Sequence, residues 1–576
     1  MKKTAILAAL IIVIVIGIIA GYFIISKIQE SKRIYEIEKI SEFNYFVYKE
    51  NENYGVIDKE GKTIIEASYE KIEIPNPSKD VFICYKNDKG IAMNGKNQQL
   101  FAEYNSISAI EIKNAVSNLP YEKSVLKTEK NGKYGLIDLS GKKIFDTEYD
   151  NIQGFSNIEG ELQIEKNGKI GVANIKGTTL VKPEYDTVGD DNYFNEGMKH
   201  GYVVGQKSED GYKYGYINSK GKLLVKVEYN DILRVTDINA NDGIYLIAAK
   251  NGQYGVIKNK KVIINNEYQS IEFDKTNKIF ILQKGKNYGV ANILGKIVIS
   301  VENTAVEAKG QYIYVEKNNI KDVYDSEGNK VDIDFNQTIL PTSNENYKIT
   351  IKSENSGNLY GIMNSNNKQI VEPEYVYIEY VFDNYFIACG QNGKLGVIDS
   401  SGKTIIDLKY DLVQKVQGKN IIQTLLSENN ITELYSEKLD KICEMQNAII
   451  DNQNEYIKIY SNKEIKYFNA NGENVKSSSV FPNNKLFASA KDEKWGYIDS
   501  NGKTVVDYKY EFASEFNEYG YAAIKQDGKW GSIDFSGKII AQPKYELKDN
   551  TNKVEFIGEY LKVSTGFENE YYTKEK

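Results

Sequence analysis

Aspartate recurs at one position of a repeated pattern and is the side chain best suited to chemistry in this chain. Each of five aspartates stands three residues before a glycine: Asp58, Asp138, Asp399, Asp499 and Asp534. Carboxylates bind Ca²⁺, but Asp-x-x-Gly lacks the alternating oxygen ligands of a calcium loop. Other residue types take the same position in other copies, at Asn174, Asn218, Asn364 and Lys258. We therefore expect these side chains to cap turns and predict no metal site.

Residues for other chemistry are scarce. The single histidine, His200, has no sequence-adjacent partner, and the three cysteines, Cys84, Cys389 and Cys443, lie far apart. They form neither a disulfide framework nor a metal-ligand spacing. There is no phosphate-binding glycine loop, nucleophile elbow or zinc signature. We predict no catalytic residues, no cofactor and no enzyme activity, although two of the 80 Asp and Glu residues could still meet as a hydrolase pair.

The elements that carry these residues are tandem copies of one pattern. Eleven copies contain the signature glycine, which follows an aromatic or apolar residue in all of them except the second, where Lys89 precedes it: Gly55, Gly90, Gly135, Gly171, Gly215, Gly255, Gly289, Gly361, Gly396, Gly496 and Gly531. Three degenerate copies have Asp322, Glu433 or Lys466 in the glycine position. The spacing is about 37 residues, which is within the range of repeat proteins.

Each copy contains the signals of a β-meander. Strand A has the alternation seen in Tyr45–Glu50 and Tyr521–Gln526. In five copies it ends at a pair that predicts a type I′ turn: Asn131-Gly132, Asn167-Gly168, Asn251-Gly252, Asn392-Gly393 or Asp527-Gly528. Strand B holds the aromatic-Gly pair, the Asp-x-x-Gly turn follows, and strand C ends at a second Tyr. We expect the bare glycine to accommodate an aromatic ring of a neighbouring copy.

The second Tyr of each copy could stack on sugars or peptides, but its regular recurrence favours packing between copies. Its positions are Tyr69, Tyr104, Tyr149, Tyr185, Tyr229, Tyr268, Tyr375, Tyr410, Tyr510 and Tyr545.

The repeats predict an all-β fold with three strands and a short fourth in each copy. Propeller sheets have this form, and fourteen copies divide into two rings of seven, repeats 1–7 over residues 43–305 and repeats 8–14 over 306–576. A continuous β-solenoid or superhelix is the alternative. The segment 559–576 resembles the opening half of a fifteenth copy, which either completes a sheet or caps an open end.

The amino-terminal region predicts a membrane anchor. After a short tail, residues 1–3, the run 4–26 is uncharged and long enough to cross a bilayer as a helix. It has no Ala-x-Ala cleavage site, so we expect an uncleaved signal anchor, followed by a helical stalk over 27–42. The short charged terminus favours an extracytoplasmic repeat body.

The recurring aromatic-Gly, Ile-Asp, Gly-Lys and Tyr-acidic pattern resembles the bacterial WG-repeat family. Trp495-Gly496 and Trp530-Gly531 are its best copies, and Tyr replaces Trp in most others. The resemblance covers nearly all of the chain after the stalk. It implies a β-rich repeat architecture with no general catalytic activity, so it provides no functional residues to transfer.

We therefore expect the functional residues to lie outside the repeating pattern. The net charge is −7 with both signs interspersed, which gives no support for nucleic-acid binding. The longest inter-copy segments, Ser106–Glu122 and Val188–Gly201, and the three degenerate copies remain as candidates. We expect a non-catalytic scaffold that binds a protein or a cell-envelope polymer. The alternatives are an envelope hydrolase with a carboxylate pair and a purely structural spacer.

Overall fold

The computed structural model describes residues 40 and 42–574, apart from 114–118, 156–158, 191–200, 239–241, 355–356, 454, 548–553 and 566–567. The chain forms two compact units. Unit 1 comprises residues up to Phe46, Tyr69–Asn167 and Val172–Thr178, and unit 2 comprises Val47–Ser68, Gly168–Gly171 and the residues from Thr179 onward.

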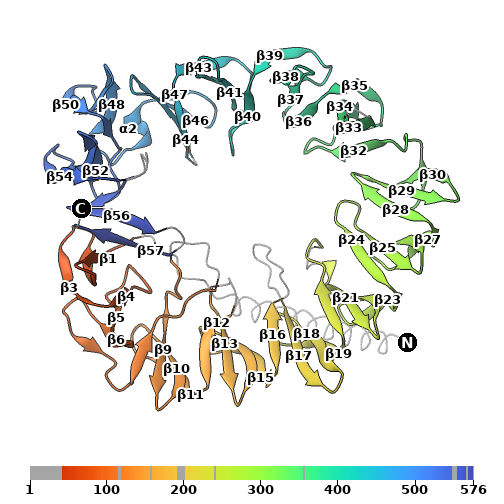
Figure 1. Ribbon diagram of the computed structural model, residues 1–576, viewed down its shortest axis with the longest axis horizontal. Helices are drawn as coiled ribbons and strands as arrows, with labels where there is room; N and C mark the ends of the chain where they lie inside the picture. The colour runs from red at the N-terminus through yellow and green to blue at the C-terminus, as the bar shows by residue number, and fades with distance from the viewer. Residues whose placement is uncertain are drawn as a thin grey trace, which may run out of the picture. The chain divides into compact units, whose positions relative to one another are not determined.

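The described residues form an all-β, propeller-like succession of fourteen small sheets, as the repeats predict. Twelve sheets have four strands, one has three and one has six. The one helix among the described residues, α2 (Ser477–Val480), has four residues. Within unit 2, Figure 1 shows sheets such as β20–β23 and β24–β27 following one another in chain order.

The strands of the first half are β1 (Tyr45–Glu50), β2 (Asn53–Asp58), β3 (Thr63–Tyr69), β4 (Lys71–Glu73), β5 (Phe82–Lys86), β6 (Lys89–Met93), β7 (Gln99–Leu100), β8 (Ser106–Ser108), β9 (Val125–Lys130), β10 (Lys133–Asp138), β11 (Lys143–Tyr149), β12 (Asn151–Gly154), β13 (Glu161–Lys166), β14 (Lys169–Asn174), β15 (Thr179–Tyr185), β16 (Thr187–Asp190), β17 (Tyr202–Ser208), β18 (Gly211–Ile217), β19 (Leu223–Tyr229), β20 (Asp231–Arg234), β21 (Tyr245–Lys250), β22 (Gln253–Lys258), β23 (Lys261–Tyr268), β24 (Ser270–Asp274), β25 (Ile279–Lys284), β26 (Asn287–Asn292) and β27 (Ile297–Asn303).

The strands of the second half are β28 (Ala305–Lys309), β29 (Tyr312–Lys317), β30 (Ile320–Tyr324), β31 (Lys330–Val331), β32 (Gln337–Pro341), β33 (Tyr347–Glu354), β34 (Gly357–Asn364), β35 (Gln369–Tyr375), β36 (Tyr377–Phe382), β37 (Tyr385–Cys389), β38 (Leu395–Asp399), β39 (Thr404–Tyr410), β40 (Leu412–Lys415), β41 (Ile422–Leu426), β42 (Ile431–Tyr435), β43 (Lys441–Gln446), β44 (Ile449–Asn452), β45 (Tyr456–Tyr460), β46 (Ile465–Asn469), β47 (Asn474–Val475), β48 (Phe487–Lys491), β49 (Lys494–Ile498), β50 (Thr504–Tyr510), β51 (Phe512–Ala513), β52 (Tyr521–Gln526), β53 (Lys529–Asp534), β54 (Ile539–Tyr545), β55 (Phe556–Ile557), β56 (Tyr560–Thr565) and β57 (Glu568–Thr573).

The sequence repeat and the sheet are offset by one strand. The short strand that follows the second Tyr of one copy pairs with strand A of the next copy, as β20 pairs with β21. Each four-stranded sheet therefore combines residues of two copies. The offset ties neighbouring copies together through backbone hydrogen bonds as well as through packing.

The predicted Asn-Gly turns form at most positions. Asn131 and Gly132 have φ of 55° and 73°, and Asp527 and Gly528 have 51° and 73°, as a type I′ turn requires. At Asn392-Gly393 only the glycine has a positive φ, 73°. The prediction is wrong there because a wider turn follows Cys389, in which Gly393 N–H donates to the Gly390 carbonyl at 2.9 Å.

The recurrent aspartates cap turns, as predicted. The Oδ1 atom of Asp138 accepts hydrogen bonds from the Ser140 and Lys142 amides at 2.8 and 2.9 Å, and Gly141 closes the turn with φ 87°. Partial burial acts to raise the pKa of Asp138, but these donors and the Ser140 hydroxyl together hold it below the usual value. Among the described residues, no group of three His, Cys, Asp or Glu side chains could hold a metal ion.

The signature glycine has a different role from the one expected. A Cβ atom at Gly396 would lie 2.4 Å from the Ile406 carbonyl oxygen, and one at Gly496 would lie 2.5 Å from that of Val506. These oxygens belong to strand C of the same sheet, whose register shifts opposite the glycine. The glycine therefore accommodates a β-bulge of strand C rather than a neighbour's ring.

The second Tyr packs against the following sheet. Tyr229 lies in one buried cluster with Ile232 and Leu246, which belong to the next sheet, and its direct partner across the bulge is Tyr214. Seven of the ten recurring tyrosines are buried and three are partly buried. Packing, rather than ligand stacking, accounts for these residues.

The two ends of the described repeats share the six-stranded sheet, whose order is β3-β2-β1-β57-β56-β55. β1 pairs with β57 in parallel, with Tyr48 opposite Tyr572, and the two strands lie side by side in Figure 1. The partial fifteenth copy thus extends the first sheet. In two separately closed rings of seven repeats, a strand of the seventh copy would lie beside β1. The pairing of β1 with β57 therefore differs from that predicted arrangement.

Packing also continues across the boundary expected between residues 305 and 306. Val290 and Ile299 of the seventh copy share a buried cluster with Ile313 and Val315 of the eighth.

The predicted tail (1–3), anchor (4–26) and nearly all of the stalk (27–42) lie outside the described residues. Within the described part of the chain, no helix has the length and apolar character to cross a membrane.

Candidate functional site

The long segment Ser106–Glu122 forms a short hairpin in unit 1. After β8, the Glu122 amide donates to the Ile110 carbonyl at 2.8 Å, and Glu111 is bridged to Tyr121. Ile110, Ile112 and Tyr121 are buried, which anchors the described parts of this segment. We call the described residues 109–113 and 119–122 the insert hairpin.

The insert hairpin buries a carboxylate that would otherwise face solvent. Glu73 is the third residue of the first strand in its sheet, a position held by Gln153, Glu272, Glu307, Glu379 and Gln414 in other sheets. Those five side chains are exposed, whereas Glu73 is only 5% exposed. Its Oε2 atom accepts hydrogen bonds from the Tyr85 hydroxyl at 2.6 Å and from the Ala109 amide at 3.2 Å. Its Oε1 atom lies 2.7 Å from Lys71 Nζ.

A pocket of about 420 Å³ lies beside the insert hairpin, and all of its lining belongs to unit 1. The lining residues are Glu73, Tyr85, Ser108, Ala109, Ile110, Glu111, Lys113, Lys127, Ile152, Gln153 and Gly154. Gly154 is required because a Cβ atom there would lie 2.2 Å from the Glu111 carbonyl oxygen. The hairpin backbone and β12 are thereby held in close contact at one wall.

Lys127 is the half-buried cation of this pocket. Burial lowers the pKa of Lys127, and the negative charge of Glu73 acts in the opposite direction. Its ammonium lies 5.0 Å from the ring centre of Tyr134. Among the described residues, no oxygen atom accepts a hydrogen bond from Lys127 Nζ. The pocket therefore offers a cation with unused donors.

Glu122, at the base of the insert hairpin, is fully buried. One of its oxygens accepts the Gly160 amide at 2.8 Å, and Oε2 has no hydrogen-bond partner among the described residues. Burial raises the pKa of Glu122 to about 7, and the Gly160 hydrogen bond only partly opposes this shift. The carboxyl group therefore changes charge near neutral pH.

Two carboxylates line the pocket, which bears on the hydrolase alternative. Glu73 and Glu111 both line it, as the hydrolase alternative requires of a carboxylate pair. Glu73, however, is occupied by three donors, so both of its oxygens already have partners. A second cavity, of about 490 Å³, is lined by the turns around Asn277, Asn292 and Asn329 of unit 2, which belong to the repeating pattern.

Among the described residues, the other candidates from the sequence do not contribute to this pocket. Most of Val188–Gly201, including His200, lies outside the described residues. The three cysteines are free.

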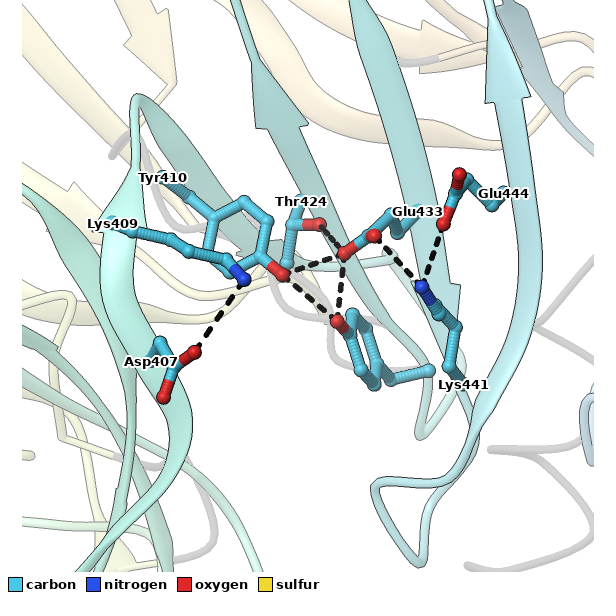
Figure 2. A network of polar contacts seen from close by, with 8 residues as sticks. Asp407, Lys409, Tyr410, Thr424, Glu433, Lys441 and Glu444 are labelled. Carbon is cyan, nitrogen blue, oxygen red and sulfur yellow. Dashed lines mark hydrogen bonds and ion pairs between the residues drawn. The ribbon is translucent and has the colours of Figure 1, made fainter.

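Of the three degenerate copies, only the one around Glu433 has a buried group in the glycine position. Figure 2 shows Glu433 between β39 and β43 of unit 2. Glu433 Oε2 accepts from the Tyr410 and Tyr435 hydroxyls at 2.6 and 2.7 Å, and Lys441 Nζ lies 3.1 Å from Oε1. Burial acts to raise the pKa of Glu433, but these three donors lower it to about 2.

The strand register explains why these copies lack glycine. Glu433 pairs directly with Glu444, without the bulge that a glycine accommodates elsewhere. In the other two degenerate copies, strand C is only two residues long, and Asp322 and Lys466 form ion pairs with Lys330 and Glu464 at 2.6 and 3.0 Å.

The segment Ser106–Glu122 stands out in the sequence by its length, whereas Glu73 and Lys127 do not stand out. Glu73 occupies a position that is acidic or amide-bearing in several other sheets, so no signal in its own sequence sets it apart.

Comparison with known proteins supports the repeat architecture. The family model described as "WG containing repeat" matches residues 54–89, 134–169, 214–254, 360–394, 396–422 and 495–530. No match is found among curated proteins.

Solved structures show distant likeness. A crystal structure of the eukaryotic initiation factor is 11% identical, with 63% of this chain and 96% of that chain covered and a TM-score of 0.22. The extracellular domain of a protein named as a hybrid two-component system of B. thetaiotaomicron is 11% identical, with 90% and 80% covered and a TM-score of 0.18. Kluyveromyces lactis Hsv2 is 10% identical, with 46% and 92% covered and a TM-score of 0.20. In six segments, then, the chain is similar to the WG containing repeat.

Proposed function

We propose that this protein is a membrane-anchored, extracytoplasmic β-repeat scaffold that binds another protein or a cell-envelope polymer without catalysis. We place its ligand in the pocket beside the insert hairpin. The observation that carries the binding proposal is the burial of Glu73 by this hairpin, which converts a solvent-facing position of the repeat into one wall of a charged pocket.

Three features of the pocket support this proposal. It is concave, its size is within the usual range for a small ligand or one unit of a polymer, and a few polar groups converge on it. Its hairpin wall comes from a long inter-copy segment, and such segments carry function more often than scaffold strands do.

The anchor part of the proposal rests on the sequence. The uncharged run 4–26 has the length of a spanning helix, and Lys2 and Lys3 precede it. Protease treatment of intact cells tests the orientation. We expect digestion of the repeats from outside, and protection until lysis would reverse the assignment.

A photo-crosslinking amino acid at Gln153 tests the binding site. The matched control is Gln414, which is also exposed and also the third residue of the first strand in its sheet, but which does not line the pocket. With the full chain in its native membrane, we expect a discrete crosslinked product from position 153 and none from position 414. Equal labelling from both positions, or no product from 153, would refute the pocket as the binding site.

Envelope hydrolysis and a purely structural spacer remain the alternative predictions. A hydrolase would lose turnover of an envelope polymer when Glu111 is changed to Gln, whereas a binding protein has no turnover to lose.

A further inference from the structure

We infer that the pocket beside the insert hairpin binds an acidic sugar residue of a polysaccharide, with the sugar carboxylate paired to the ammonium of Lys127. This inference rests on the function proposed above and adds the chemical class of the ligand.

Lys127 has an incomplete set of partners. Its β9 position places it opposite Ser108, and both residues line the pocket. Its side chain is half-buried, so part of its hydration is lost, and the Tyr134 ring offers only a weak interaction at 5.0 Å. A carboxylate in the pocket would supply the charge-assisted hydrogen bonds that the described protein groups do not.

Glu73 does not serve as the carboxylate partner of Lys127, because both of its oxygens already have other partners. Its oxygens accept from Tyr85 and Ala109 and pair with Lys71. Glu73 therefore contributes negative potential near Lys127 without accepting a hydrogen bond from its ammonium. Its hydrogen bond with Tyr85 also holds the Tyr85 hydroxyl at the pocket wall.

The charges of the lining favour a monoanion. Glu73 and Glu111 balance Lys113 and Lys127, so the pocket has no large excess of positive charge. A doubly charged phosphate would meet both carboxylates, whereas a carboxylate adds a single charge. Lys113 is exposed at the rim, where it can steer an acidic polymer toward the opening.

The remaining lining favours a sugar over a peptide side chain. Sugar hydroxyls both donate and accept hydrogen bonds. The Ser108 hydroxyl and the Gln153 amide can do the same, and Glu111 accepts. The apolar lining is limited to Ala109, Ile110 and Ile152 together with the Tyr85 ring, which is little surface for an extended peptide.

Saturation-transfer NMR on the full chain in detergent tests this assignment with three probes, glucuronate, glucose and N-acetylglycine. Inorganic phosphate, which has no carbon-bound protons, is tested as a competitor of glucuronate. We expect glucuronate to bind at least about tenfold more tightly than glucose, which lacks the carboxylate, since one charge-assisted hydrogen bond contributes roughly that factor. Glucuronate should also bind more tightly than N-acetylglycine, which lacks the sugar hydroxyls, and than phosphate, whose second charge meets the two carboxylates. Glucose binding equally well would refute the role of the carboxylate. N-acetylglycine binding equally well would assign the pocket to peptide carboxylates instead, and equal phosphate binding would refute the monoanion.

Three variants test whether glucuronate binding depends on the charge of Lys127 itself, rather than on the fold or on the charge of a neighbouring lysine. Lys127→Met keeps the length of the side chain and removes its charge, so glucuronate binding should be lost, whereas Lys127→Arg should retain it. Lys130→Met changes an exposed lysine of the same strand and should bind as the wild type does. Thermal unfolding of each variant reports whether the fold persists. Glucuronate binding that survives in folded Lys127→Met overturns the inference, as does an absence of glucuronate binding in the wild type.

Crosslinking from position 153 distinguishes this inference from the proposed function. If the product persists in Lys127→Met and glucuronate does not compete with it, the pocket binds a ligand of another class. If the wild type gives no product, the proposed function fails, whatever the probes show.

Discussion

The carboxylate of Glu433 accepts a 2.6 Å hydrogen bond from the hydroxyl of Tyr410, which belongs to the preceding sheet of the repeat array. Tyr410 is the recurring second Tyr of its copy, and Glu433 stands where most copies have glycine. A departure from the repeat pattern thus connects two consecutive sheets.

Restoring the repeat pattern at this position should destabilise the protein. Glu433→Gly would leave the Tyr410 and Tyr435 hydroxyls without their shared acceptor. We expect a loss of about 1–3 kcal/mol in unfolding free energy, measured by chemical denaturation. Glu444→Gln is the control because the Glu444 side chain is 52% exposed, and it should change stability by less than about 0.5 kcal/mol. A Glu433→Gly variant as stable as the wild type would show that the network contributes nothing.

The signature glycine should not tolerate even one methyl group. In Gly496→Ala the new Cβ atom would lie 2.5 Å from the Val506 carbonyl oxygen, so the bulge must move. We expect a loss of about 1–3 kcal/mol, as in an overpacked core. Gly189→Ala, in β16, is the matched control, since a Cβ atom there meets nothing within 4 Å. Similar midpoints for the two variants in thermal unfolding would argue against the bulge explanation.

Stability should fall as the pH rises toward neutrality because of Glu122. Its pKa in the folded chain is raised from 4.5 to about 7, so between these values the folded state retains a proton that the unfolded state has released. The difference corresponds to up to about 3 kcal/mol, present in full below pH 4.5 and lost above pH 7. Glu159, Glu161 and Lys123 act on the same group and modulate the shift.

Denaturation between pH 4.5 and 7.5 measures this effect. Glu122→Gln should flatten the slope across this window because the neutral amide has no proton to lose. An unchanged slope in the variant would assign the pH dependence to other groups.

The carboxy-terminal strands should protect the amino-terminal sheet. Deletion of residues 554–576 removes β55–β57 and exposes the edge of β1, together with the Tyr48 ring that lies 5.3 Å from Tyr560. Hydrogen exchange followed by mass spectrometry should show faster exchange in β1 and unchanged exchange in β49, which belongs to another sheet. Equal protection of β1 in the truncated chain would mean that its pairing with β57 is dispensable.

Local features were predictable from the sequence because they depend on neighbouring residues. The type I′ turn at Asn131-Gly132 and the capped turn at Asp138 each follow from a few residues and their allowed dihedral angles. Strand boundaries such as the end of β52 (Tyr521–Gln526) follow from turns of this kind, here at Asp527-Gly528.

Features that depend on register were not predictable in this way. The role of Gly496 became clear only from the bulge in β50, because the contact is with a backbone oxygen ten residues away. Likewise, Glu73 is buried by the insert hairpin, and nothing in the sequence places Ala109 beside it. The length of Ser106–Glu122 nevertheless identified the segment that makes the pocket.

The pairing of β1 with β57 also has a consequence for biosynthesis. Tyr48 emerges more than five hundred residues before its partner Tyr572, which at roughly 5–20 residues per second is a delay of about half a minute to two minutes. During that interval one edge of the first sheet has no strand beside it, and such edges recruit other chains. The nascent protein therefore passes through a period of vulnerability to aggregation that ends only when its last strand is made.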